Sequence, residues 1–290
     1  MEGGSSRFSR GAGSPDGTDG YLEDIDGGVF TVLVHVLGPP RVAVNGVPVP
    51  LGGRRTHIIL AVLALEANWA VPLDRLVDTV WGTSPPASAR TQIRICVSMM
   101  RRAFAEAGAP ELIETYRSGY CLRLADSDLD AAVFDTLVSH ARSLASDGLT
   151  AEAVLEIHRA LALWTGPALA SLSCPALESG ARRLEEGRLR AIEERVRLEL
   201  ALGRHEDLIG ELIELAAEHP FREHLHGQLM LALYRSHRTA EALAVYRKLR
   251  LTMVEELGIE PGQELSDLEE AILLGLEKVN VRETNVRLCP

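Results

Sequence analysis

Hydrophobic and polar positions alternate at the start of the ordered part of the chain. Residues 29–37 read Val-Phe-Thr-Val-Leu-Val-His-Val-Leu, and two further β-branched runs flank Asn45-Gly46. Both central positions of a tight hairpin turn need a positive φ, which Asn and Gly tolerate best. The pattern therefore predicts short strands that form a small antiparallel sheet over residues 29–51.

The apolar period then changes to that of helices. It favours helices over about residues 53–68, 72–81 and 87–107, with Pro72 and the Pro85-Pro86 pair marking helix starts. A period of two returns at residues 111–116 and 120–124. Between them lies Arg117-Ser118-Gly119, whose glycine is expected to supply the turn of a second hairpin.

The second half of the chain shows no convincing strand. Similar helical segments begin near Gly203 and Ser236, roughly one tetratricopeptide period (about 34 residues) apart, and a third follows Asp147-Gly148. This spacing predicts helical hairpins that bury their apolar stripes against one another. The expected fold is thus an α+β winged helix-turn-helix over residues 29–124, followed by an all-α, tetratricopeptide-like region over residues 125–276.

Composition and charge narrow the class of protein. Hydrophobic residues make up 46% and charged residues 24%, as in globular proteins. The longest apolar run, Ile58–Leu65, is far shorter than the roughly 20 residues of a membrane span, and the acidic stretch 1–28 lacks the features of a secretory signal. We expect a cytoplasmic, nucleoid-associated protein without membrane contact, with a disordered tail over residues 1–28 and a short tail over 277–290.

The net charge of −11 is unevenly distributed. Residues 29–124 contain 10 Arg and 6 acidic side chains, whereas residues 125–290 contain 18 basic and 29 acidic ones. A basic region beside a strongly acidic one indicates that residues 29–124 bind phosphate groups, whereas residues 125–290 bind a different kind of partner.

The third helical segment is the candidate recognition helix. Ile93, Val97, Met100 and Phe104 recur at helical spacing and define its core face. Polar and basic side chains lie opposite or beside that face, where Arg can bind guanine and Thr or Ser can reach phosphate or a base. The alternative is an ordinary solvated basic face. The outward set is Thr91, Arg94, Ile95, Ser98 and Arg102, with Arg90 and Arg101 closer to the core edge.

The hairpin that follows also bears on whether this region binds DNA. Arg117 lies at the tip of a strand-turn-strand unit directly after the candidate recognition helix. A wing in that position can insert an Arg into or beside the minor groove. Taken alone, an exposed turn Arg is usually only solvated.

Several motifs in this order resemble one known family. The first part is similar to an OmpR-type winged helix-turn-helix, and more closely to the Streptomyces antibiotic regulatory protein (SARP) family, in the sequences at residues 51–55, 72–82, 85–90, 97–102 and 118–120. The second part resembles the bacterial transcriptional activation domain of that family in the sequences at residues 160–169, 200–205, 218–223, 229–235 and 256–262.

The resemblance implies a transcriptional activator without catalysis or cofactor. Such a protein binds direct repeats in promoter DNA, as a homodimer or as copies side by side, and recruits RNA polymerase through its sigma and alpha subunits. The target is expected to be a cluster for antibiotic biosynthesis. The residues implied to contact DNA are Arg90, Thr91, Arg94, Ser98, Arg101, Arg102 and Arg117, with Arg54 and Arg55 near backbone phosphate or polymerase.

The turn between the second and third helices corresponds to the loop that OmpR-type activators offer to polymerase. Its alternative role is simply to connect two helices. The expected polymerase-contact loop comprises Gly82, Thr83, Ser84, Pro85 and Pro86.

The chain also departs from the family pattern. Relatives usually carry Gln, Tyr and Arg where this chain has Arg94, Cys96 and Met99. The resemblance therefore leaves the operator sequence open. The chain contains no Gly-x-x-x-x-Gly-Lys loop for a nucleotide.

The histidines of residues 219–226 do not predict a metal site. His219, His224 and His226 are close in sequence, but positions 224 and 226 lie about 200° apart on a helix and cannot share an ion, so no metal is expected. One alternative function is a ligand-gated DNA-binding regulator. The other is a helical-repeat adaptor that binds no DNA.

Overall fold

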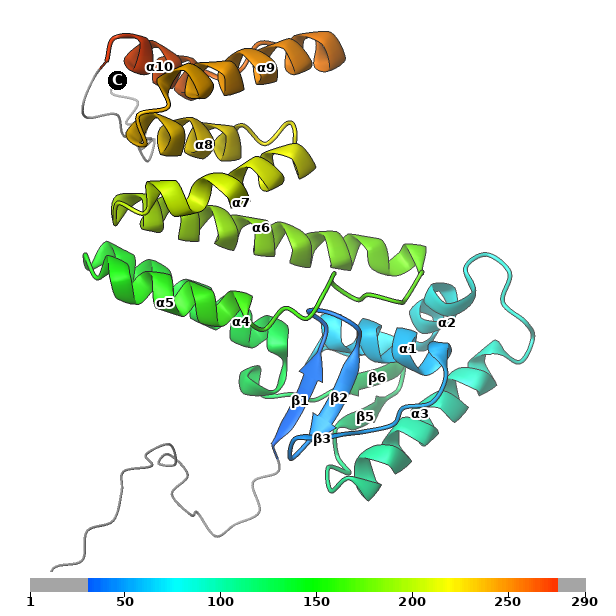
Figure 1. Cartoon of the computed structure of the whole chain (residues 1–290). Helices are drawn as coiled ribbons and strands as arrows, with labels where there is room; N and C mark the ends of the chain where they lie inside the picture. The colour runs from blue at the N-terminus through cyan, green and yellow to red at the C-terminus, as the bar shows by residue number, and fades with distance from the viewer. Residues whose placement is uncertain (1–30, 276–290) are drawn as a thin grey trace, which may run out of the picture.

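The computed structural model describes residues 31–275 (Figure 1). An N-terminal region (residues 31–124) contains two small sheets and three helices, and a helical region (residues 125–275) extends away from it as a stack of helices. The tails predicted over residues 1–28 and 277–290 lie outside the described residues.

The first sheet follows the alternating pattern. Its strands run antiparallel in the order β1 (Val32–His35), β2 (Arg41–Val44) and β3 (Val47–Pro48). Asn45 and Gly46 join β2 to β3 with φ of 51° and 76°. The predicted positive-φ hairpin turn is thereby confirmed.

Three helices follow, as the apolar period predicts. They are α1 (Arg54–Leu65), α2 (Leu73–Trp81) and α3 (Ala89–Glu106). Helix α1 is the central one, since every residue from Ile58 to Ala64 is buried. Its continuous apolar run therefore reflects burial on all sides rather than a membrane span.

The second sheet has the strand order β4 (Val71–Pro72), β6 (Gly119–Leu122), β5 (Ile113–Tyr116). The expected hairpin is present, but the sequence pattern missed β4. The prediction that Gly119 supplies the turn was wrong, because Gly119 is the first residue of β6 and has no positive φ. Any residue larger than glycine is excluded at position 119, because its Cβ would lie 1.8 Å from the carbonyl oxygen of Val71 in β4.

The second half of the chain is helical, as expected, among residues 125–275. Consecutive helices lie beside each other in an antiparallel stack that ends at the top of Figure 1. The elements are η1 (Asp126–Asp128), α4 (Asp130–Ser146), α5 (Thr150–Leu161), η2 (Pro175–Leu177), α6 (Glu178–Ala201), α7 (His205–Glu218), α8 (Glu223–Arg235), α9 (Thr239–Leu257) and α10 (Gln263–Leu273).

The two regions share one hydrophobic core. It runs without a break from the first sheet and α1 into α4, α5 and residues of α6 that include Ala191 and Leu198, while a second core unites other residues of α6, among them Leu189 and Val196, with α7 to α10. Asp130, 1% exposed at the start of α4, accepts hydrogen bonds from the backbone N–H groups of Val36 and Leu37 at 2.9 and 3.1 Å. Gly180 of α6 lies against Leu65 of α1, so a Cβ there would come within 2.5 Å of that side chain. The helical region is thus built onto the N-terminal region rather than tethered to it.

Candidate DNA-binding interface

Helix α3 presents the two faces that its sequence predicts. Ile93, Val97, Met100 and Phe104 are each at most 1% exposed and anchor the helix in the shared core. On the outward side, Ile95 and Met99 are 52% and 50% exposed, which is unusual for large apolar residues. The exposed polar and basic residues of that face are Arg90, Thr91, Arg94, Ser98 and Arg102.

Arg94 and Arg117 are the least engaged of the predicted contacts. Both are exposed, and neither forms an ion pair with any residue in 31–275. Arg102, with a side chain 82% exposed, donates to Glu106 one turn later at 2.8 Å. The hydrogen bond to Glu106 raises the pKa of Arg102 above its ordinary value, so the side chain stays cationic.

Two of the predicted contacts are tied to neighbouring helices. Arg90, at the start of α3, pairs with Asp74 of α2 at 2.5 Å, although both side chains remain more than 60% exposed. Arg55 donates to Gln92 of α3 at 2.5 Å and lies over the ring of Trp81, 5.3 Å from its centroid. These contacts connect α3 to α1 and α2.

Arg54 has a contact that the sequence did not predict. Its guanidinium donates to the backbone carbonyl of Ser173 in the segment before η2. The side chain remains exposed at the start of α1, beside Arg55. One of its donors therefore joins the N-terminal region to the helical region, and the remaining donors face solvent.

Arg101 differs from its neighbour Arg102. It donates through Nε and Nη2 to the carbonyl oxygen of Ile113 at 3.1 and 2.8 Å, and through Nη2 to the hydroxyl of Thr115 at 2.7 Å. Both acceptors belong to β5 of the wing hairpin. Arg101 therefore points into the protein, where it connects α3 to the wing.

A second polar network stiffens the wing and was missed by the sequence analysis. Glu114 accepts from Tyr116 of the same strand, β5, and from Arg123, which directly follows β6, both at 2.9 Å. The hydrogen bonds from Tyr116 and Arg123 lower the pKa of Glu114. Asn68, with φ of 67°, exchanges hydrogen bonds with the backbone of Leu124 and so fixes the base of the same hairpin.

The expected polymerase-contact loop, residues 82–86, is exposed at every position. It lies between α2 and α3 at the edge of the molecule opposite β1 (Figure 1). Gly82 begins it with φ of 64°, a left-handed conformation in which glycine is favoured.

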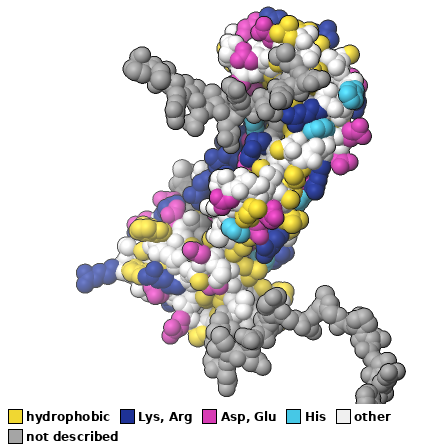
Figure 2. Space-filling model, turned by 90° about the vertical axis from the view of Figure 1, so that its left-hand side faces the viewer, with side chains coloured by type: hydrophobic (Ala, Val, Ile, Leu, Met, Phe, Trp, Pro, Cys, Tyr) yellow, Lys and Arg dark blue, Asp and Glu magenta, His cyan; other side chains and the backbone are white. Residues whose placement is uncertain are grey.

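The helical region offers a different surface. On the face drawn in Figure 2, basic, acidic and hydrophobic side chains are interspersed rather than gathered by charge. His224 lies 3.8 Å from Glu193 and does not join the other two histidines of the sequence cluster in a metal site. Within residues 31–275, no group of three His, Cys, Asp or Glu side chains is arranged to hold a metal ion.

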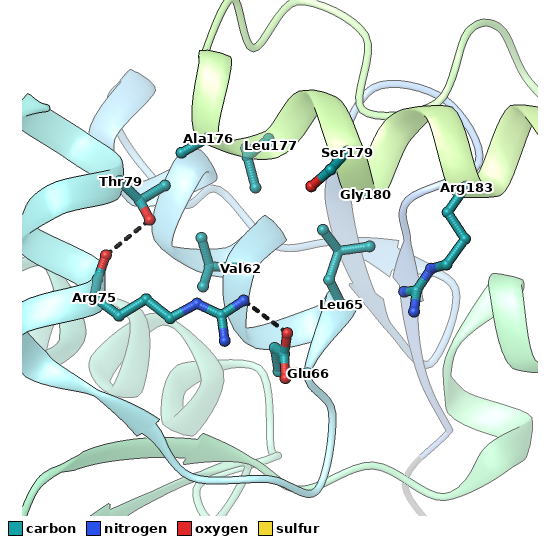
Figure 3. Close-up of a pocket in the computed structure, with 10 residues that line it drawn as sticks. All are labelled: Val62, Leu65, Glu66, Arg75, Thr79, Ala176, Leu177, Ser179, Gly180 and Arg183. Carbon is teal, nitrogen blue, oxygen red and sulfur yellow. Dashed lines mark hydrogen bonds and ion pairs between the residues drawn. The ribbon is translucent and has the colours of Figure 1, made fainter.

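Two cavities bear on small-molecule binding. One, of about 280 Å³, lies between α1, α2 and α6, where Arg75 reaches across to Glu66 at 2.7 Å and Arg183 enters from α6 (Figure 3). A larger one, of about 740 Å³, lies between α6 and α7. No helix within residues 31–275 is long and apolar enough to span a membrane.

The fold and this surface define a winged-helix DNA-binding regulator with an attached helical region. Two family profiles match, "Transcriptional regulatory protein, C terminal" over residues 48–122 and "Bacterial transcriptional activator domain" over residues 129–273. The chain belongs to the SARP family of DNA-binding transcriptional regulators, which are not enzymes.

Individual relatives support this assignment. Regulatory protein DnrI of Streptomyces peucetius is 37% identical over 83% of this chain and 91% of its own length. Regulatory protein AfsR of Streptomyces coelicolor is 37% identical over 82% of this chain, but the match covers only 24% of AfsR. The solved structure of Mycobacterium tuberculosis EmbR in complex with a low affinity phosphopeptide superimposes with a TM-score of 0.83 at 32% identity, covering 87% of this chain and 67% of EmbR. The alternative of an adaptor that binds no DNA is therefore wrong.

Proposed function

We propose that this protein is a sequence-specific activator of a promoter that controls an antibiotic or other secondary-metabolite cluster. Helix α3 enters the major groove of a direct repeat and Arg117 reaches the adjacent minor groove. Copies lie side by side on successive repeats. The similarity to DnrI, a regulatory protein of Streptomyces peucetius, supports a regulatory role.

The observation that carries the proposal is the outward face of α3. Arg94 has no ion-pair partner within residues 31–275, and Arg102 is held only by an exposed Glu106. A guanidinium that stays exposed on a rigid helix can bind guanine or phosphate at little cost in ordering. Thr91 and Ser98 supply hydroxyl groups on the same face. The exposed Ile95 and Met99 fit contact with thymine methyl groups.

Arg90, Arg54 and Arg55 are assigned supporting contacts with backbone phosphate. All three are exposed, and each already has one protein partner that orients it. Phosphate contacts of this kind fix the protein on the duplex without reading its sequence.

The loop at residues 82–86 is assigned the contact with the sigma or alpha subunit of RNA polymerase. Its complete exposure and its position between two packed helices support this role. The helical region arranges further protein contacts between copies or with polymerase.

Affinity selection of fragmented host DNA with the full-length protein at moderate salt, followed by sequencing and footprinting, tests the DNA-binding part. We expect enrichment of promoter-proximal direct repeats spaced about one helical turn, roughly 10 base pairs. The Arg94→Ala/Arg102→Ala variant is expected to lose this enrichment. Unchanged enrichment with that variant would overturn the assignment of α3 to the groove.

Arg182→Ala is the matched control. Arg182 and Arg102 are both 82% exposed, and each pairs with a Glu four residues away, but Arg182 lies on α6 of the helical region. This variant removes the same charge and should keep the enrichment.

Activation is tested by transcription in vitro from the selected promoter with purified polymerase. The Thr83→Ala/Ser84→Ala variant should bind the operator normally and lose activated transcription. Full activation by that variant would show that the loop only connects two helices.

The ligand-gated regulator stays a prediction. The cavity of about 740 Å³ between α6 and α7 falls in the size range of small-molecule sites. A metabolite that changes operator affinity at fixed salt would support this version.

A further inference from the structure

The two consecutive arginines of α3 have opposite surroundings. Arg102 faces solvent with 82% of its side chain exposed, and it pairs with Glu106 on the same helix. Arg101 is half-buried and donates three hydrogen bonds to the neighbouring hairpin. Neighbouring residues on a helix point about 100° apart, so one can face outward while the other faces the wing.

Arg101 contacts both strands of the wing. Ile113 and Thr115, its acceptors, belong to β5, which is an edge strand of the second sheet. An edge strand leaves its outer carbonyl groups without a strand partner, and Arg101 supplies donors for the one at Ile113. Its guanidinium also lies over the ring of Tyr120 in β6, 5.8 Å from the centroid.

These contacts lie next to the tip of the wing. Thr115 pairs with Tyr120 in the hairpin register, and Arg117 follows Thr115 by two residues. Two residues span at most about 7 Å, so fixing Thr115 restricts the position of the tip. The planar guanidinium presents its donors on separate atoms in a fixed geometry, which suits a carbonyl and a hydroxyl held together, whereas a Lys ammonium carries its three donors on one atom of a flexible chain.

We infer that Arg101 is a positioning residue and not a direct DNA contact: it fixes the distance between α3 in the major groove and Arg117 at the minor groove. This inference rests on the proposed function. It replaces the direct contact that the family resemblance implies for Arg101. A protein that contacts two grooves at once binds tightly only when the two contacting elements, here α3 and Arg117, are held at the right separation. If one of them is misplaced, its contacts with DNA are lost.

A double-mutant cycle on the operator duplex tests the inference. We expect Arg101→Ala and Arg117→Ala each to weaken binding about tenfold, the scale of one lost groove contact. If Arg101 acts through the wing, the double variant is also about tenfold weaker, because the tip contact is already lost. Multiplication of the two effects to about a hundredfold would overturn the inference and make Arg101 an independent contact.

Thr115→Val provides a second readout that leaves Arg101 in place. It removes one acceptor from the wing without altering any charge, and it keeps a β-branched residue in β5. We expect operator binding to weaken about threefold, with no change in the slope of log affinity against log salt. Full affinity in this variant would contradict the positioning role, since a direct contact by Arg101 does not need Thr115.

Lysine substitution separates the two roles further. A phosphate contact through charge alone is retained in Arg101→Lys, whereas the two-acceptor grip on the hairpin is not. We therefore expect Arg101→Lys to bind the operator nearly as weakly as Arg101→Ala. Restoration of wild-type affinity by Lys would overturn the inference.

Arg94→Ala distinguishes failure of this inference from failure of the proposed function. If Arg94→Ala leaves operator binding unchanged, the groove assignment itself is wrong. If Arg94→Ala weakens binding but the Arg101 and Arg117 effects multiply, only the positioning role is wrong. Circular dichroism and thermal unfolding identify any variant that fails to fold, and the Thr115→Val result then decides.

Discussion

Arginines on the outward face of α3 and arginines inside the helical region differ in exposure and in the number of acidic partners. On the outward face of α3 they are exposed and have at most one acidic partner, as Arg102 has with Glu106. In the helical region, Arg195 is 8% exposed and donates to Glu199 and Glu211 at 2.9 and 2.5 Å. Arg222 there forms a two-bond pair with Glu193 at 2.7 and 3.0 Å and also binds Glu186.

The number of carboxylates that an arginine already binds affects whether it can bind DNA. A guanidinium that already holds two carboxylates would have to leave them to reach phosphate, and it would leave a buried carboxylate without a partner. The same residue type is therefore available for recognition on the outward face of α3 and serves structure at Arg195 and Arg222. Acidic partners and position in the fold together decide between the two roles, since Arg182 is as exposed as Arg102 but lies on α6, and the total charge of −11 does not decide it.

Breaking the Arg222 pair has the largest expected effect. Glu193→Ala leaves Arg222 with Glu186 only and removes a carboxylate whose side chain is 9% exposed. We expect the free energy of unfolding to fall by about 2–3 kcal/mol, as for a partly buried pair that loses one member, with operator affinity unchanged. Urea denaturation measures this loss. The control is Glu178→Ala, in an exposed pair with Arg182; an equal loss there would contradict the account.

The same pair predicts a pH dependence. Burial by itself raises the pKa of Glu193, but the nearby His224 and the hydrogen bonds from Arg222 outweigh it and lower the pKa to about 2 from an ordinary value of 4.5. Because the folded pKa is below the unfolded one, the pair stabilises the protein fully above pH 4.5 and progressively less as pH falls toward 2.

Comparison of the wild type with Glu193→Gln isolates that contribution. The difference between their free energies of unfolding should be constant near neutral pH and shrink through the acid range. A difference that grows on acidification has the wrong sign and would refute the assignment.

Glu106→Gln tests whether the acidic partner of Arg102 weakens DNA binding by the recognition helix. It removes the carboxylate partner of Arg102 and one negative charge from the DNA-facing side. We expect affinity for duplex DNA to rise about threefold at low salt, with a smaller gain at high salt because exposed charges are screened. Fluorescence anisotropy titrations at two salt concentrations measure this. Weaker binding by the variant would mean that Glu106 helps to orient Arg102.

The smallest expected effect belongs to Arg182→Ala. Its exposed pair with Glu178, four residues away on α6, should be worth no more than about 0.5 kcal/mol of stability. Thermal unfolding should be nearly unchanged, and so should DNA binding. A marked loss of DNA affinity would show that α6 also lies against the duplex.

Local patterns allowed much of the fold to be predicted. The spacing of Ile93, Val97, Met100 and Phe104 predicted the buried face of α3, and Asn45-Gly46 predicted the first hairpin. Both features depend on neighbours a few residues away, whose geometry is fixed by helix and turn periods. The change of period likewise predicted the order of the elements.

Contacts between distant segments could not be predicted in this way. Strand β4 has two residues and exists only because β6, nearly fifty positions later, pairs with it. The small size of Gly119 serves that pairing rather than a turn. Asp130 meets the backbone 94 residues earlier, and Arg54 meets Ser173 across 119 residues. No periodic signal encodes such partners, because packing selects them.

The candidate site shows the same distinction between features set by local periodicity and features set by contacts with distant segments. The outward direction of Arg94, Ser98 and Arg102 was predicted correctly, since it follows from the helix period. The helix period placed Arg101 near the core edge, but its contacts with the wing were not predicted, because they depend on where β5 carries its carbonyl and hydroxyl groups.

The most direct test of the central claim is a pair of anisotropy titrations with full-length protein, on a selected operator duplex and on a scrambled duplex of equal length. The ratio of the two affinities measures specificity. The account predicts that Arg94→Ala/Arg102→Ala lowers this ratio by about a hundredfold, from two groove contacts of about 1–3 kcal/mol each, while Arg182→Ala leaves it unchanged. An unchanged ratio in the double variant, or an equal loss in Arg182→Ala, would contradict it.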